Sequence, residues 1–270
     1  MSVTMCYASG GEDAGEQLMH HILDGHSWQP IPAVTPIPLH NITIGPVTIP
    51  ITRHVIMLLI NALLLIVVFT TAFGKKRIVP SGIASALEPL VFFVRDDLVY
   101  AAMGKELGEK WLTFFYTLFF FILTSNLIGM IPFFSTATGN LSITGALALM
   151  IFIAIIVTGM RKNGFIGFFK NMVPPGLPLP IGIFVFMIEL PGLIIRSGVL
   201  AIRLFANMIA GHFVIYSLLL LIFLIHPFVS VISVPMAVFI DLLEVLVAII
   251  QAIVFTTLSA LFISMAVSHD

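Results

Sequence analysis

Five long apolar stretches constrain this chain more than any other feature of its sequence. They cover about residues 55–73, 111–131, 141–160, 181–225 and 229–267. Each meets the threshold of about 18 predominantly apolar residues with which a helix crosses roughly 30 Å of hydrocarbon. None shows the alternation of a membrane β-barrel, and helices satisfy their own backbone hydrogen bonds in lipid. The sequence therefore predicts an all-α polytopic membrane protein.

The composition agrees with a chain that is solvated mainly by lipid. Hydrophobic residues make up 59% of the 270 positions and charged residues only 9%, whereas soluble domains carry roughly 25% charged residues. The formal net charge of −1 includes no basic excess that would favour nucleic acid. We therefore expect a lipid bilayer, and no nucleic acid, as a partner.

The last two apolar stretches are longer than one perpendicular crossing requires at about 1.5 Å of rise per residue. The first is broken only by Pro191 and glycines, and the second has Pro235 near its start. The first is either one steeply tilted helix or a helical hairpin, and the second is also overlong. If each crosses once, the chain has about five crossings, two of them by long tilted helices.

Two further segments differ from the spans. Residues 1–52 are polar and rich in proline, which predicts an extra-membrane arm preceding a transmembrane domain at 53–270. Residues 78–110 mix apolar and charged side chains, and their apolar positions recur at helical spacing. This pattern predicts one amphipathic helix at the membrane interface. The apolar positions are Leu87, Leu90, Val91, Val94 and Leu98.

The placement of Lys and Arg predicts the orientation. Positive charges concentrate in cytoplasmic segments, and a five-crossing topology places nine of them on one side and Arg53 on the other. The N-terminus is then outside and the C-terminus cytoplasmic. An uncleaved chain of this kind fits a bacterial inner membrane, with an organelle inner membrane as the alternative. The nine residues are Lys75, Lys76, Arg77, Arg95, Lys105, Lys110, Arg161, Lys162 and Lys170.

Several polar residues lie inside the fourth apolar stretch, where ionisable groups are costly and usually functional. Glu189, Arg196 and Arg203 are seven residues apart, and Asn207 follows one turn later. On a helix this spacing produces one slowly drifting stripe. Arg203 is too deep for its guanidinium to reach the interface easily, so a nearby carboxylate or water must stabilise it.

The fifth stretch carries a second polar face. Asp241, Glu244, Ala248, Gln251 and Phe255 recur at helical spacing. Two such faces can line an aqueous path. Alternatively, the charges pair between helices and only fix the helix register; for Glu189 and Arg196 both interpretations stay open.

Glu244 and His212 can exchange a proton with water near neutral pH if they lie on neighbouring polar faces. Asp241 lies nearer the outer end of its helix and is either a pathway residue or a solvated vestibule group. Asn126 and Asn61 are candidate interhelical hydrogen-bonding residues. The sequence thus predicts a proton path through the last two spans.

No metal or cofactor site is expected. The histidines of the arm have no zinc-ligand spacing and no cysteine pair, and there is no glycine-rich phosphate loop. The run Arg95, Asp96, Asp97 is similar to acidic clusters that bind magnesium diphosphates, but a second such motif is absent. The arm histidines are His20, His21, His26 and His40.

These motifs together resemble subunit a of the F-type ATP synthase membrane sector. The segment LAIRLFANMIAGHFV, residues 200–214, is similar to the arginine-helix signature of that family, with Glu189 fourteen residues before the arginine. The resemblance covers about residues 85–267. Further similar segments are LEPLVFFVRDD, SNLIGMIPF around Asn126, TGNLSITGALAL, and LLEVLVAIIQAIVF around Gln251.

The resemblance implies a role for each matching residue. Arg203 matches the essential arginine that faces the carboxylate of a rotating c-subunit ring, with Asn207 and Gln251 beside it. His212 and Glu244 match paired positions where some bacterial members have the two residue types exchanged. Gly129 stands where some relatives have an acid.

The implied function is that of a proton-translocating stator subunit with two offset half-channels. Protons enter from outside past Glu244, His212 and Asn126, and Arg203 separates the two paths. The implied partners are the c ring, peripheral-stalk subunit b and the other ATP synthase subunits. The subunit has no nucleotide site, so it does not itself hydrolyse ATP. The sequence leaves open H⁺ or Na⁺ as the coupling ion.

Two rival functions remain at this stage. An ion-coupled transporter would use Arg203 to bind an anionic substrate. An intramembrane lipid-modifying enzyme would use Asp96 and Asp97 at the interface.

Overall fold

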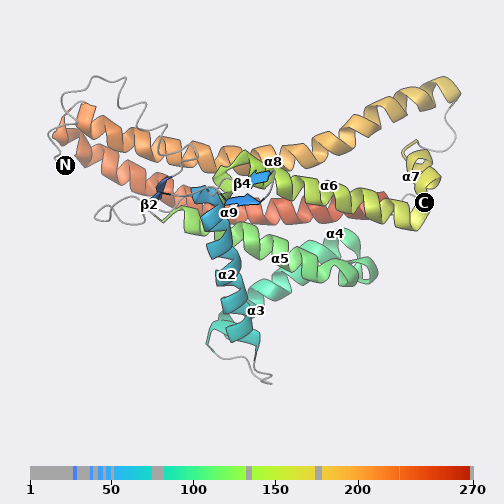
Figure 1. Cartoon of the computed structure of the whole chain (residues 1–270), viewed down its shortest axis with the longest axis horizontal. Coiled ribbons are helices and arrows are strands. Elements are labelled where there is room, and N and C mark those ends of the chain that lie inside the picture. The colour runs from blue at the N-terminus through green and yellow to red at the C-terminus, as the bar shows by residue number, and fades with distance from the viewer. Residues whose placement is uncertain are drawn as a thin grey trace. The chain divides into compact units, whose positions relative to one another are not determined.

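The computed structural model describes five long helices, and they agree with the five predicted spans (Figure 1). All five are long and apolar enough to cross a membrane. They are α2 (Arg53–Phe73), α5 (Lys105–Gly129), α6 (Leu141–Asn163), α8 (Leu179–Leu224) and α9 (Ser230–Val267). The residues that the structure describes are 27–28, 37–38, 42–44, 47–49, 52–74, 82–131, 136–173, 178–224 and 226–267.

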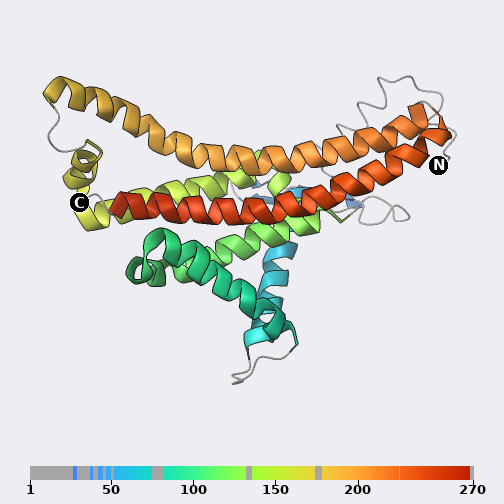
Figure 2. The same ribbon diagram turned by 180° about the vertical axis from the view of Figure 1, so that it is seen from behind.

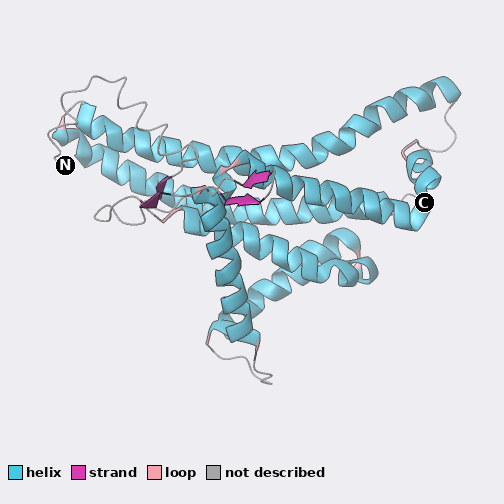
Figure 3. Cartoon of the chain, viewed as in Figure 1, coloured by secondary structure: helices cyan, strands magenta, loops and turns pink. Residues whose placement is uncertain are grey.

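The fourth and fifth stretches are each one continuous helix, so the hairpin alternative is wrong. Helix α8 has 46 residues and α9 has 38. Pro191 and Pro235 both lie inside their helices. Each proline removes one backbone N–H donor, but the surrounding turns continue the helix. Figure 3 shows both helices without interruption.

The predicted amphipathic helix is present as three consecutive elements. These are α3 (Ile83–Phe93), the π-helix η2 (Val94–Tyr100) and α4 (Ala101–Met103). Gly104, with φ of +73°, separates α4 from α5, a left-handed conformation that glycine adopts without steric cost. A further short helix, α7 (Phe165–Asn171), follows α6. The location of α3 at a membrane interface stays a prediction.

The all-α prediction holds for every predicted span, but the arm also has four very short strands that the sequence reading did not predict (Figure 3). Strand β1 (Ser27–Trp28) pairs antiparallel with β2 (Ile37–Pro38). Strand β3 (Ile42–Ile44) pairs antiparallel with β4 (Val47–Ile49). The division of the chain at residue 52 stays a prediction.

By its internal contacts the chain divides into two compact units. Unit 1 comprises residues 1–64, 123–140 and 204–250. It contains the first half of α2, the end of α5, the short 3₁₀ helix η3 (Ala137–Gly139), most of the second half of α8, the 3₁₀ helix η4 (Pro227–Val229) and the first part of α9. Its most buried apolar side chains include Met57, Leu204 and Met208.

Unit 2 comprises residues 65–122, 141–203 and 251–270. Within it, α6 lies beside the C-terminal part of α9 in both views (Figures 1 and 2). The side-chain amide of Asn163 donates a hydrogen bond to the carbonyl oxygen of Ala266, 3.4 Å away. The buried side chains Phe115, Phe119 and Ile155 belong to this unit.

Candidate functional site

Arg203 lies near the middle of α8, and its side chain is exposed. The buried side of the same helix segment is formed by Leu200, Leu204 and Met208, all at most 1% exposed. At about 100° of rotation per residue, Arg203 points roughly 100° away from the middle of that side. Among the described residues, its guanidinium has no hydrogen bond or ion pair. The helix therefore presents an unpaired cation outside its packed face.

Glu189 and Arg196 form an ion pair. Arg196 Nη2 donates a hydrogen bond to Glu189 Oε1 at 2.6 Å, and about a third of each side chain is exposed. The expected alternative was pairing between helices, but both residues lie on α8, two turns apart. The pair thus belongs to the predicted stripe without linking α8 to another span.

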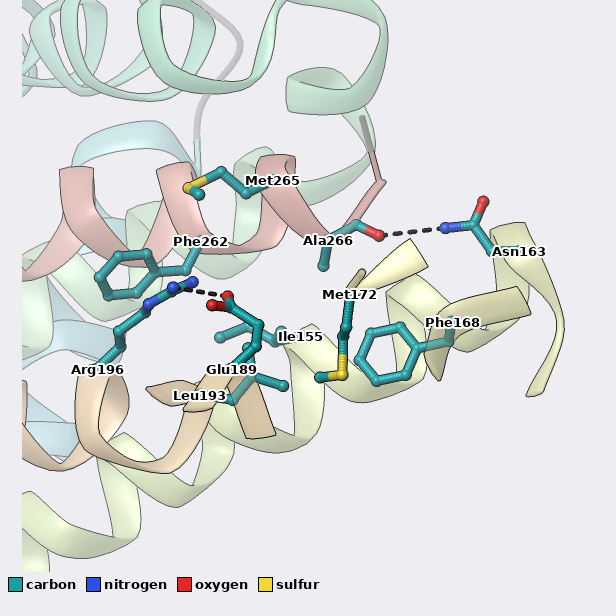
Figure 4. A pocket seen from close by; sticks show the side chains of 10 residues that line it. All are labelled: Ile155, Asn163, Phe168, Met172, Glu189, Leu193, Arg196, Phe262, Met265 and Ala266. Atoms are coloured by element: carbon teal, nitrogen blue, oxygen red, sulfur yellow. Dashed lines mark hydrogen bonds and ion pairs between the residues drawn. The ribbon is translucent and has the colours of Figure 1, made fainter. Parts of the chain in front are cut away.

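The Glu189–Arg196 pair lines a cavity of about 40 Å³ in unit 2, shown in Figure 4. This volume has room for water. Its other walls are mainly apolar, and Asn163 closes one end through its bond to Ala266. The remaining lining residues come from α6, α7 and the residue after it, α8 and α9: Ile155, Phe168, Met172, Leu193, Phe262 and Met265.

His212 and Glu244 face each other in unit 1. His212 Nδ1 lies 3.6 Å from Glu244 Oε1, slightly beyond hydrogen-bond distance. Glu244 is only 5% exposed, and among the described residues its carboxyl oxygens have no hydrogen-bond partner. A Cβ on Gly211 would lie 2.6 Å from the Glu244 carboxyl carbon. Glycine at position 211 therefore makes room for this carboxyl group.

Asn126 reaches the same helix as Glu244. Its Nδ2 lies 3.5 Å from the carbonyl oxygen of Ala248, one turn after Glu244, and its Oδ1 accepts a hydrogen bond from Thr138 Oγ1 at 2.7 Å. Asn126 is fully buried. The structure thus brings Asn126, His212 and Glu244 into one unit.

The predicted polar face of α9 is only partly buried. Glu244, Ala248, Gln251 and Phe255 are each at most 5% exposed, whereas Asp241 is exposed. Asn207 on α8 is half-buried. The residues at helical spacing thus share a buried face only in the part of α9 from Glu244 onward, and Asp241 lies outside that buried part.

Gly129 lies against the side chain of Thr136. A Cβ at position 129 would overlap Thr136 Cβ and lie 2.7 Å from Thr136 Oγ1. An acidic side chain would have no space here. Glycine at position 129 therefore lets Thr136 pack against the end of α5.

Sequence reasoning missed three polar residues of unit 1, namely His54, Thr136 and Thr138. They are at most 5% exposed and joined by hydrogen bonds. No spacing rule relates them, because they come from different segments. Asn61 was expected to bond between helices, and it does so by donating to Ser125 Oγ at 2.6 Å.

Asp96 is already engaged. Arg95 donates two hydrogen bonds to its carboxylate, each of 2.9 Å. These bonds hold the pKa of the Asp96 carboxyl below its ordinary value. The same guanidinium lies over the Phe92 ring, 4.6 Å from its centroid. This pairing engages one of the two aspartates that the rival lipid-modifying enzyme would use.

No metal centre is present among the residues that the structure describes, which contain no group of three possible ligands. The arm histidines His20, His21, His26 and His40 lie outside the described residues.

Comparison with known proteins decides the family. The family model described as "ATP synthase A chain" matches residues 55–264. The chain belongs to this family. It is 40% identical over 274 residues to ATP synthase subunit a 2 of Prosthecochloris aestuarii, covering 98% of this chain and 83% of that protein.

Two other bacterial relatives agree. Subunit a of Chloroherpeton thalassium is 41% identical over 258 residues, which are 93% of this chain and 77% of that protein. Subunit a of Myxococcus xanthus is 46% identical over 237 residues, which are 84% of this chain and 77% of that protein. The five apolar helices and the bacterial relatives of this family together identify the chain as a multi-pass bacterial membrane protein.

Proposed function

We propose that this member of the ATP synthase A chain family provides two offset proton half-channels to a rotating ring of c subunits, and that Arg203 faces the ring carboxylate and separates the two paths. The coarser role, that of the proton-translocating stator subunit of an F-type ATP synthase, follows from family membership. The observation that carries the finer proposal is the exposed guanidinium of Arg203 within a candidate membrane span, which has no ion pair among the residues that the structure describes.

A cation at this position needs an anion or water nearby. Since the described part of the chain pairs no carboxylate with Arg203, we propose that a carboxylate of the c ring supplies the anion. A neutral carboxyl can face lipid whereas a charged one cannot. Arg203 would favour the ionised carboxyl and so release its proton. The fixed positive charge would also repel protons between the two paths.

One path would contain Asn126, His212 and Glu244. These residues lie together in unit 1, and the buried Glu244 carboxyl faces the His212 imidazole. Asp241, which is exposed near the start of α9, would be a vestibule group of this path. By the positive-inside argument this path opens to the outer side. Protons would enter here and neutralise a ring carboxylate.

The other path would contain Glu189 and Arg196. Their cavity has room for water and lies in unit 2. Cytoplasmic placement is supported by Arg161 and Lys162 in the last turn of α6, because Asn163 of that turn also lines the cavity. Asn207 and Gln251 would complete the polar surface beside Arg203. Each proton moved through the membrane potential yields about 2.3 kcal/mol per 100 mV.

The partners follow from this arrangement. Other ATP synthase subunits are partners of the family as a whole. We propose contacts with the c ring along α8 and α9, and with peripheral-stalk subunit b elsewhere on the chain. In a bacterial inner membrane, the N-terminus would lie on the outer side and the C-terminus on the cytoplasmic side. No ligand other than protons is required.

The Arg203→Ala variant tests the proposal in the whole membrane complex. ATP synthesis driven by an imposed proton gradient should vanish, while the c-subunit proteolipid still co-purifies with the variant chain. Arg203→Lys should keep assembly and lose most synthesis, because an ammonium group lacks the planar fork of guanidinium. Synthesis at the unmodified level in Arg203→Ala would refute the proposed role of the arginine. Purification of the natural chain without any proteolipid would refute the proposed partner.

A further inference from the structure

His54 lies buried in the first turn of α2, and the proton path proposed above does not use it. Its side chain is 5% exposed, and Nδ1 lies 2.8 Å from the carbonyl oxygen of Thr136. A carbonyl oxygen only accepts hydrogen bonds, so the ring donates from Nδ1. In the neutral ring this contact fixes the tautomer. His54 therefore holds the backbone of residue 136.

Thr136 belongs to a short segment that packs against the end of α5. Its Oγ1 lies 2.7 Å from Thr138 Oγ1, to which it donates, and 3.3 Å from the carbonyl oxygen of Ser125. Thr136, Ala137 and Thr138 are each at most 4% exposed. The segment is thus packed in one position, with His54 on one side and α5 on the other.

Thr138 connects this segment to Asn126. Its hydroxyl donates to Asn126 Oδ1 at 2.7 Å, which leaves the Nδ2 end of the amide directed at the carbonyl oxygen of Ala248. A rotated amide would place Asn126 Oδ1 against the Ala248 carbonyl oxygen, which only accepts hydrogen bonds, so the observed orientation is favoured. The Thr138 contact therefore holds the amide in this orientation, one turn from Glu244 along α9.

We infer that His54 is a positioning residue for proton transfer, acting through Thr136 and Thr138 to fix the orientation of Asn126 beside Glu244. This inference rests on the proposed path through Asn126 and Glu244. All the contacts lie within unit 1. His54 does not transfer a proton through this series of contacts, because the carbonyl oxygen of Thr136 carries no proton that it could donate.

The test uses whole ATP synthase in membrane vesicles and measures proton flux, its pH profile, and co-purification of the other subunits. An asparagine amide can donate from nearly the position of His Nδ1, whereas alanine cannot. His54→Ala should lower flux about five-fold, the order expected for one hydrogen bond. His54→Asn should stay within about two-fold of the natural chain, with an unchanged pH profile.

Asn61→Ala is the matched control. Asn61 is also buried on the same helix, but its side chain bonds to the side chains of Thr124 and Ser125 on α5, whereas His54 bonds to the backbone of Thr136. It should keep flux within about two-fold, because a general loosening of α2 does not rotate Asn126. Equal losses in Asn61→Ala and His54→Ala would overturn the inference.

Thr138→Val keeps the test decisive if His54→Ala fails to assemble. This nearly isosteric change removes the hydroxyl donor and should reproduce the loss of flux in an assembled complex. Where His54→Ala assembles, the double variant should be no worse than the more impaired single variant, because both act through one chain of contacts. Additive losses would contradict the inference.

Three further outcomes distinguish failure of the inference from failure of the proposed function. If His54→Asn loses as much flux as His54→Ala and its pH profile shifts, the titrating imidazole itself is required and the positioning role is wrong. If Asn126→Leu and Glu244→Gln leave flux unchanged, the proposed path fails. If those two variants lose flux but His54→Ala and Thr138→Val do not, only the inference about His54 fails.

Discussion

Arg196 Nη2 and Glu189 Oε1 lie 2.6 Å apart across two turns of one helix, and together they line a cavity of about 40 Å³. Among the described residues that line this cavity, Glu189 carries the only carboxylate, and the ion pair sets its position. The ion pair lies on the same stripe of α8 as Arg203. Among the described residues, Arg203 has no carboxylate partner. Two arginines seven residues apart are thus in different electrostatic situations.

The ion pair predicts a specific pattern of losses. Arg196→Ala should lower ATP-driven proton pumping about two- to five-fold, a modest effect because both side chains are partly exposed. Arg196→Lys should recover much of this loss. A double-mutant cycle with Glu189→Gln, measured as pumping rate in vesicles, should show coupling between the two sites. Fully additive effects would mean that the ion pair plays no part in proton movement.

The contact between Gly211 and Glu244 predicts a functional loss with little loss of stability. The atoms nearest a Cβ at position 211 are the Glu244 carboxyl carbon and oxygens, at 2.6 to 3.0 Å. Gly211→Ala should push this flexible group away from His212 and lower proton flux about ten-fold, while the melting temperature of the complex changes little. Gly198→Ala on the same helix is the control, since nothing lies within 4 Å of its Cβ. Equal flux in both variants would contradict the proposed role of Glu244.

Gly129 predicts a loss of stability instead. Its neighbour is Thr136, whose side chain and Cα leave no space for a Cβ. Gly129→Ala should cost about 1–3 kcal/mol, seen as a lower melting temperature or less assembled complex, and Thr136→Gly should recover part of it. Gly145→Ala, with open space around its Cβ, should cost little. A stable Gly129→Asp complex would show that the segment at Thr136 can move aside.

The pairing of His212 with Glu244 predicts rescue by exchange. Either His212→Glu or Glu244→His alone places two like groups at positions where the natural side chains lie 3.6 Å apart, and should lower flux strongly. The double exchange restores one acid and one imidazole, so it should recover more flux than either single change. Flux measurements in vesicles would contradict coupling if the losses simply add.

The sequence alone predicted the spans well because the length of each apolar run directly reflects the thickness of the bilayer. Helix α6 begins at Leu141, as predicted, and α9 ends at Val267, as predicted. Helix α5 begins earlier than expected, at Lys105, because its first turn is charged and hydropathy does not register it. The stripe through Arg203 and the α9 face from Glu244 also follow from helical spacing alone.

The polar contacts could not be predicted in the same way. His54 and Thr136 are 82 residues apart, and no periodic pattern relates a first-turn histidine to a connecting segment. The pairing of Arg196 with Glu189 depends on side-chain rotamers, so spacing left pairing between helices equally open. The short strands of the arm are two or three residues long, too short to produce a readable alternation.

The central claim concerns the positive charge of Arg203, which we propose separates two proton paths. Passive proton flux through the assembled membrane sector, measured in vesicles stripped of the catalytic sector, tests this most directly. If the charge is the barrier, Arg203→Ala should conduct protons at least as fast as the natural sector, although it no longer supports ATP synthesis. A sector with Arg203→Ala that blocks passive flux completely, or that still synthesises ATP at the natural rate, would contradict the account.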